Sequence, residues 1–109
     1  MAQGVGQDFR GQSTAVRIIW SRRAVRHLVA VRDYITKDRP TSATVVAARI
    51  LKSVELLATQ PQIGRPGRVV GTRELVVPDS PYVIPYRVRG ESLELIAVFH
   101  GRRRWPKKL

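Results

Sequence analysis

The chain has 109 residues, contains no cysteine and carries a formal net charge of +12 at pH 7. Its length predicts a single domain with one modest core, and the lack of cysteine excludes disulfides, thiolate metal sites and cysteine nucleophiles. Its 20 lysines and arginines, most of them arginines, against eight acidic residues predict attraction to a polyanion, either nucleic acid or an acidic protein.

Residues 1–15 are rich in glycine, glutamine and serine and show no apolar period, so we expect a flexible N-terminal extension there. The folded domain is expected at residues 16–109 and should end in a basic C-terminal tail. No apolar run approaches the roughly 18 residues that a membrane span needs, so no membrane partner is expected. The lack of cysteine fits the reducing cytoplasm, where we expect the protein to act.

The first half of the domain predicts one strand and two helices. Residues 16–20 are rich in β-branched and aromatic side chains and predict a strand, after which Ser21 can cap a helix. Apolar residues at helical spacing then predict helices over residues 22–37 and 41–59. Because Pro40 breaks the pattern and the connection is short, the two helices should form an antiparallel hairpin.

The second half of the domain predicts three strands. Two prolines and two glycines within residues 60–67 indicate an irregular connection. Alternating apolar residues then predict strands at 72–77, 82–88 and 93–100, joined by tight turns into an antiparallel sheet. Pro85 lacks the N–H that strand pairing uses, so we expect a bulge there or an outward-facing edge. The order β-α-α-β-β-β predicts an α+β fold, with the helical hairpin covering one face of the sheet.

The chain has side chains suited to phosphodiester chemistry but none in the pattern of a metal site. Its two histidines lie on different predicted elements and no carboxylates cluster, so neither a metal nor a cofactor is expected. Cleavage of RNA needs a general base, a general acid and cations that stabilise the phosphorane. If the protein is a nuclease, the candidates for these roles are His100, Arg73, Arg87 and Tyr86.

Each of these candidates also has a structural interpretation. Tyr86 alternates with apolar residues and is expected in or near the core, and Arg73 can lie at a sheet margin. A lone histidine such as His100 is more often packed than catalytic. The charge run at residues 102–104 is expected in solvent, whereas Trp105 should either pack back onto the domain or meet a partner.

Six short motifs relate this sequence to a known family. They are WS at residues 20–21, DYI at 33–35, GRPG at 64–67 after Pro61, GTREL at 71–75, PYVIPYRV at 81–88 and HGRRRWP at 100–106. In this order and spacing the sequence resembles toxins of the RelE/ParE superfamily from bacterial type II toxin–antitoxin systems. The resemblance covers roughly residues 16–106 and implies the same α+β fold.

The residues resemble the ParE branch of that superfamily more than its ribonucleases. Ribonucleases similar to YoeB place an acidic residue directly after the turn that GRPG matches, where this chain has Gly67. They place an arginine on the third strand, where this chain has Val83, and usually end in a tyrosine that the HGRRRWP segment lacks. The resemblance therefore implies a ParE-like toxin that inhibits DNA gyrase without being an enzyme. A RelE-like ribosome-dependent mRNA endonuclease and a basic nucleic-acid-binding domain remain the alternatives.

The resemblance also implies partners and contact residues. A cognate ParD-like antitoxin of the ribbon–helix–helix class would neutralise the toxin in a hetero-oligomer that stabilises plasmids, and DNA would be met only through gyrase or the antitoxin. An acidic disordered tail that folds onto a basic toxin would account for the net charge. Antitoxin-facing candidates on the first helix are Arg22, Arg23 and Arg26, which otherwise form a solvated face. Candidates for contact with the target or the antitoxin are Arg65, Arg68, Arg73, Arg87, His100, Arg102, Arg103, Arg104 and Trp105.

Overall fold

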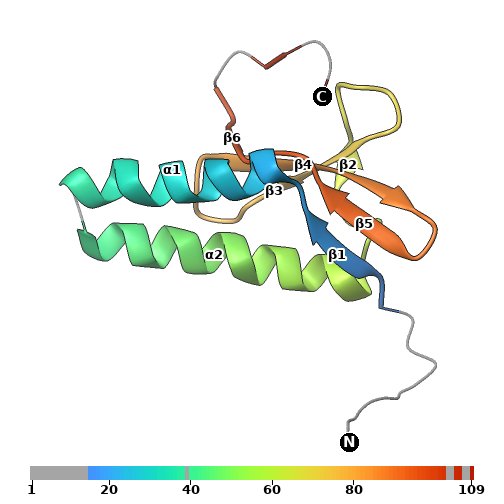
Figure 1. The fold of residues 1–109 in the computed structure, drawn as a ribbon, viewed down its shortest axis with the longest axis horizontal. Helices are drawn as coiled ribbons and strands as arrows, with labels where there is room; N and C mark the ends of the chain where they lie inside the picture. Colours follow the sequence, from blue (N-terminus) through green and yellow to red (C-terminus); the bar gives the residue numbers. More distant parts are fainter. Residues whose placement is uncertain (1–14, 39, 103–104, 107–108) are drawn as a thin grey trace, which may run out of the picture.

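The fold is an α+β arrangement in which two long helices lie side by side along a twisted sheet (Figure 1). The computed structural model describes residues 15–38, 40–102, 105–106 and 109, so the predicted extension up to residue 14 and Arg103 and Arg104 lie outside the described residues. The predicted fold class is confirmed. The elements are β1 (Arg17–Trp20), α1 (Arg22–Asp38), α2 (Pro40–Thr59), β2 (Arg65–Pro66), β3 (Arg73–Val76), β4 (Tyr82–Arg89), β5 (Ser92–Leu95) and β6 (Phe99–His100).

Ser21 begins the helical hairpin and ties it to the sheet. Its Oγ accepts a hydrogen bond from the backbone N–H of Ala24 at 3.0 Å, as an N-cap does. The same hydroxyl donates to the backbone carbonyl of Ile96 at 2.9 Å. The second helix begins at Pro40 itself, because proline at the first helical position loses no intrahelical hydrogen bond. None of the helices in the described part of the chain is long and apolar enough to cross a bilayer.

The sheet has the order β1-β5-β4-β3-β2, and β6 also pairs with β4. The N-terminal strand β1 runs parallel to β5, whereas all other pairs are antiparallel. The prediction that residues 60–67 contain no regular structure is wrong, because β2 pairs with β3 in the register Arg65↔Glu74 and Pro66↔Arg73. A strand at the sheet edge tolerates proline, whose missing N–H costs no ladder bond when it faces outward.

The last predicted strand is interrupted opposite Pro85, which lies on the neighbouring strand β4. The prediction of one strand over residues 93–100 is wrong, since residues 96–98 separate β5 from β6. Tyr86 pairs with Leu95 and Val83 pairs with Phe99, so three residues on β5–β6 oppose two on β4 between these pairs, which is a bulge.

The reason for the bulge is the missing proline donor. The carbonyl of Pro85 accepts from the N–H of Ile96 at 2.9 Å. In an antiparallel strand the N and the C=O of one residue face the same neighbour, so Pro85 also presents its missing N–H to this segment. The strand β4 itself runs unbroken through Pro85, and the bulge lies opposite this proline instead of at it. The alternative of an outward-facing edge is wrong, because β4 is an interior strand and the proline is fully buried.

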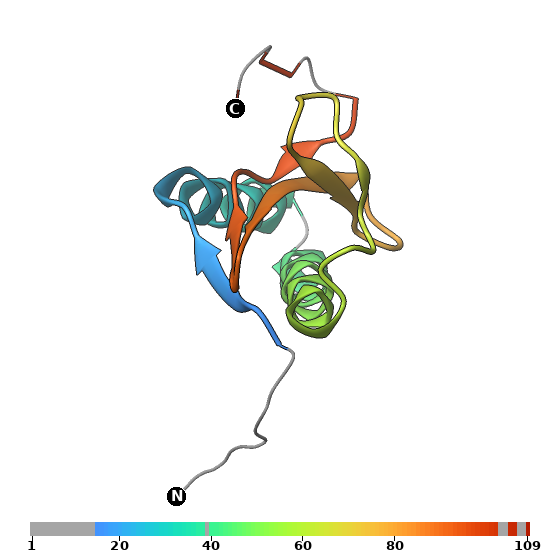
Figure 2. The ribbon, with the colours of Figure 1, turned by 90° about the vertical axis from the view of Figure 1, so that its right-hand side faces the viewer.

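Two hydrophobic clusters stabilise the fold. The larger lies between the helices and the sheet, and its fully buried members include Ile50 and Leu57 of α2 and Ile84, Tyr86 and Leu95 of the sheet. The smaller cluster contains Ile96, Ala97 and Phe99, against which Trp105 and Leu109 pack. The coloured segment that follows β6 lies on the side of the sheet away from α2 (Figures 1 and 2). Trp105 and Leu109 therefore cover part of the smaller cluster, whose Phe99 also meets the ring of His27 of α1.

Candidate functional site

A buried carboxylate organises the arginines that follow α2. Glu74 of β3 is 3% exposed. Its Oε1 accepts from Nη2 and Nε of Arg65 at 3.0 and 3.3 Å, and its Oε2 accepts from the backbone N–H of Arg68 at 2.8 Å. The Nε of Arg68 lies 3.3 Å from the same Oε2. A buried charge needs such partners, because unpaired burial of a carboxylate is costly.

We call residues 64–72 the arginine loop, and close backbone packing fixes its shape. A Cβ on Gly64 would lie 2.6 Å from the ring of Tyr86, and one on Gly67 would collide with the hydroxyl of Thr72. The N–H of Gly67 donates to the carbonyl of Thr72 at 2.8 Å, and the hydroxyl of Thr72 donates to the carbonyl of Val69 at 2.6 Å. The loop is therefore held from within rather than only at its ends.

Arg73 is directed inward to the base of this loop. Its Nη1 donates to the carbonyls of Gly64 at 2.7 Å and Gln62 at 3.2 Å. Three predicted contact residues, Arg65, Arg68 and Arg73, thus lie together around the loop. The guanidinium of each arginine interacts with groups of the same chain. The residue types in the sequence could not show these intramolecular contacts.

Tyr86 is a structural residue at the base of the arginine loop. Its side chain is fully buried, and its hydroxyl donates to the carbonyl of Pro61 at 2.8 Å and accepts from the N–H of Gly64 at 2.9 Å. Burial raises the pKa of Tyr86 above its ordinary value of 10.0, although the Gly64 hydrogen bond and the charge of Arg73 act in the opposite direction. A proton held this way is not available to a reacting phosphate near pH 7.

The other two nuclease candidates lie elsewhere. Tyr82 pairs with His100 on one side of β4 and Tyr86 pairs with Arg73 on the other. The two pairs are a four-residue step apart along β4, about 13 Å at roughly 3.3 Å per residue, and the width of the strands adds to the separation of His100 from Arg73. Arg87 alternates with Tyr86 along β4 and points to the opposite face, where its Nη1 lies 3.8 Å from Glu94. The residues predicted for general acid–base chemistry therefore do not converge.

His100 is exposed at the end of β6. Its Nδ1 accepts from the backbone N–H of Arg102 at 3.2 Å, which turns the chain as it leaves the sheet. Its ring meets the ring of Tyr82 edge to face, with centroids 5.7 Å apart. Arg102 is exposed, whereas Arg103 and Arg104, predicted as contact residues, lie outside the described residues.

Trp105 packs back onto the domain, which is one of the two outcomes that the sequence left open. Its ring lies 4.8 Å from the ring of Phe99, and the guanidinium of Arg68 lies 3.6 Å above its centroid. The indole Nε1 is buried and has no hydrogen-bond partner among the described residues. The C-terminal tail and the arginine loop therefore meet through Trp105 and Arg68.

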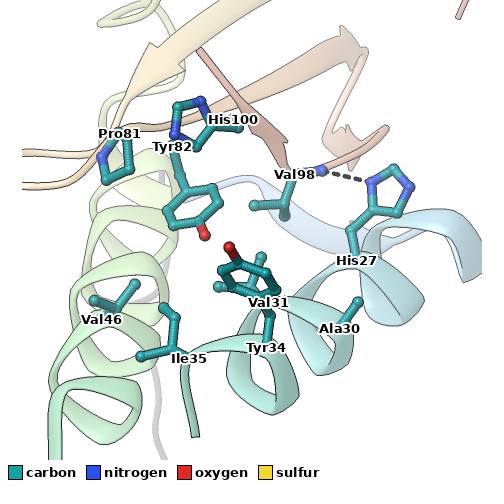
Figure 3. A pocket seen from close by; sticks show the side chains of 10 residues that line it. All are labelled: His27, Ala30, Val31, Tyr34, Ile35, Val46, Pro81, Tyr82, Val98 and His100. Carbon is teal, nitrogen blue, oxygen red and sulfur yellow. Dashed lines mark hydrogen bonds between the residues drawn. The ribbon is translucent and has the colours of Figure 1, made fainter. Parts of the chain in front are cut away.

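A pocket of about 540 Å³ opens beside the helices, at residues that the sequence did not single out together (Figure 3). Two tyrosine hydroxyls, of Tyr34 from α1 and Tyr82 from β4, point toward one another in it (Figure 3). Burial and then the neighbouring Tyr34 raise the pKa of Tyr82 above 10.0. Nδ1 of His27 accepts from the N–H of Val98 at 3.1 Å. The lining residues are His27, Ala30, Val31, Tyr34, Ile35, Val46, Pro81, Tyr82, Val98 and His100.

The predicted antitoxin-facing arginines at the start of α1 divide into two groups. Arg22 and Arg26 are exposed, as the solvated interpretation requires. Arg23 is half-buried and lines a smaller hollow of about 300 Å³ together with Arg87 and Glu94. No group of three or more histidine or acidic side chains lies close enough to hold a metal ion in the part of the chain that the structure describes.

Comparison with known proteins places the chain in a family. Residues 18–105 match the family model of the ParE toxin of the type II toxin–antitoxin system parDE. Y4kP of Sinorhizobium fredii, a protein named as a toxin, is 47% identical over 93 residues, which cover 85% of this chain and 96% of that protein. The toxin RelE2 of Caulobacter vibrioides is 33% identical over 87 residues, 80% of this chain and 97% of that toxin.

The fold leads to the same family. A solved structure of the chromosomal ParDE toxin–antitoxin system from P. aeruginosa superposes with a TM-score of 0.74 at 26% identity, covering 81% of this chain and 98% of the other. The family match, over residues 18–105, spans the helical hairpin and nearly all of the sheet. The chain therefore belongs to the ParE toxin family, within the RelE/ParE superfamily of type II toxin–antitoxin toxins.

Proposed function

We propose that this toxin acts by binding DNA gyrase in the bacterial cytoplasm and not by cleaving RNA. The observation that carries the proposal is the state of Tyr86, whose buried hydroxyl is engaged by Pro61 and Gly64. Nη1 of Arg73 beside it donates to two backbone carbonyls, and His100 lies across β4 from Arg73, a further four-residue step of about 13 Å along the strand at roughly 3.3 Å per residue. An RNA-cleaving site needs its acid and base within hydrogen-bond reach of one phosphate.

We further propose that a cognate ParD-like antitoxin of the ribbon–helix–helix class neutralises the toxin in a hetero-oligomer. The chain carries a net charge of +12, which suits a partner with an acidic segment that folds on binding. The similarity to one chain of a ParDE system supports a partner of this kind. Exposed Arg22 and Arg26 of α1 and Arg102 of the tail are the proposed contacts for its carboxylates.

A supercoiling assay tests the gyrase proposal. Purified toxin added to gyrase, ATP and relaxed plasmid should block supercoiling or accumulate cleaved plasmid, and prior mixing with equimolar antitoxin should restore supercoiling. Absence of any effect at saturating toxin would refute the proposal. If affinity for bare DNA instead falls steeply with salt while gyrase is untouched, the protein is a basic nucleic-acid-binding domain.

Cells that express the toxin test the ribonuclease alternative. RNA ends mapped after induction should show no cleavage linked to codons. Replacing His100 with Ala is the matched test, because loss of a general base would lower a nuclease rate by roughly 100-fold or more. Codon-linked cleavage that disappears in His100→Ala would overturn the proposal.

A further inference from the structure

We propose that Val70, at the tip of the arginine loop, is the anchor that inserts into an apolar pocket on the toxin's protein target. The inference rests on the proposed function, since it takes the target to be a protein. Val70 is 97% exposed, more than any other large apolar side chain among the described residues, and Tyr34 follows at 71%. Single exposed apolar residues are common on protein surfaces, so exposure alone does not carry the inference.

The loop presents Val70 on a rigid support. On one side of the tip the N–H of Arg68 is held by the buried Glu74 carboxylate at 2.8 Å. On the other side Thr72 donates both its N–H and its hydroxyl to the carbonyl of Val69, at 3.1 and 2.6 Å. Gly71 follows the tip with φ +83°, a conformation that favours glycine and makes the chain turn back there. A preorganised anchor loses little conformational entropy on binding.

A hollow beside the tip completes a surface that fits an acidic protein. It has a volume of about 290 Å³ and includes Gly71, directly next to Val70. Arg73 lines it and brings positive charge to a hollow large enough for a partner's side chain. The partner chemistry that fits is an apolar pocket for Val70, in a surface whose acidic side chains face the positive charge around the hollow. The lining residues are Gln62, Pro66, Gly71, Thr72, Arg73 and Val88.

The arginines around the tip favour a protein over a nucleic-acid partner. Phosphate recognition by arginine uses the free planar fork of the guanidinium. Here Arg65 directs Nε and Nη2 at Glu74, and Arg73 directs Nη1 at two carbonyls. Arg68 lies between the Glu74 carboxylate and the ring of Trp105. An apolar tip among cations that are already engaged is suited to burial in a protein pocket.

Three substitutions at Val70 and one elsewhere test the inference. Val70→Asp should lower affinity for gyrase by about 30-fold or more, the scale of a hot-spot residue. Val70→Thr keeps the shape but adds a hydroxyl, so a loss of roughly 5-fold is expected, while Val70→Ile should bind nearly as well as the wild type. The matched control is Val45→Asp on α2, where a valine that is 42% exposed receives the same charge. Each variant is checked for wild-type unfolding temperature and antitoxin binding.

The outcomes separate this inference from the gyrase proposal. Loss of gyrase binding by Val70→Asp with retention by Val45→Asp supports the inference, and wild-type binding by Val70→Asp overturns it.

If the wild-type toxin itself leaves gyrase unaffected, the gyrase proposal fails, and the effect of each variant is then measured as growth arrest on induction. Arrest relieved only by Val70→Asp, at equal protein level, then supports a target contact at the tip, and unchanged arrest overturns it. Equal loss of affinity for a bare 20-base-pair duplex, about two helical turns, would assign the tip to DNA instead.

Discussion

Removal of the Glu74 carboxylate should loosen the arginine loop without unfolding the sheet. In Glu74→Ala the backbone N–H of Arg68 loses its acceptor, and so do the guanidiniums of Arg65 and Arg68. Glu74→Gln keeps an oxygen that can accept from the Arg68 N–H but removes the negative charge. The two variants therefore separate the hydrogen bond from the charge.

The expected loss follows from the exposure of each partner. An orphaned N–H costs about 1–3 kcal/mol. The side chains of Arg65 and Arg68 are 53% and 44% exposed and can return to water, so each ion pair contributes only roughly 0.5–1 kcal/mol. Removal of the buried carboxylate also ends its desolvation cost, which reduces the net loss. We expect a loss of about 2–3 kcal/mol for Glu74→Ala and about 1 kcal/mol for Glu74→Gln, by the same reasoning.

Urea unfolding measures both values from the shift in midpoint at constant m. A loss below about 0.5 kcal/mol for Glu74→Ala, the range of ordinary surface changes, would refute the view that this carboxylate organises the loop. Equal losses in the two variants would assign the effect to charge rather than to the Arg68 hydrogen bond.

Two further predictions concern tyrosine ionisation and the bulge. Because burial raises the pKa of Tyr82 and Tyr86 in the folded state, their contribution to stability should be constant below about pH 10 and fall above it, where the unfolded chain releases these protons first. Urea midpoints from pH 8 to about 11 measure this, and a flat profile would contradict it. His27→Phe should cost about 1–3 kcal/mol because the N–H of Val98 loses its acceptor, whereas His27→Gln can keep one. An unchanged melting temperature in His27→Phe would show that water satisfies that N–H.

The elements that follow from local patterns could be predicted from the sequence. The helical spacing of apolar residues predicted α1 and α2, whose apolar side chains pack in the core. The bulge followed from Pro85, whose missing donor is a property of one residue in any strand. The two-residue strand β2 could not be predicted, because its pairing depends on Glu74 and Arg65 meeting across the sheet edge. The break at residues 96–98 was missed because its cause lies in the neighbouring strand.

The sequence predicted which residues belong to the candidate site but not how their side chains are arranged. The family resemblance implied Arg65, Arg68 and Arg73 as contact residues, yet the direction of a guanidinium depends on partners distant in sequence. A carboxylate within GTREL, in a chain with only eight acidic residues, was the available signal that the loop has an internal counter-charge. Nothing in the sequence indicated that Val70 would stand alone at the tip.

The bulge also explains how the C-terminal tail comes to meet the arginine loop. Pro85 interrupts the ladder, and the break places Phe99 at the start of a separate strand. Trp105 then packs against Phe99 and lies under the guanidinium of Arg68, which is in turn tied to the Glu74 carboxylate. An unbroken run of contacts thus joins the tail to the base of the loop that presents Val70. Because a preorganised contact loses little entropy on binding, this run of contacts supports the rigid presentation of Val70 that the proposed target contact requires.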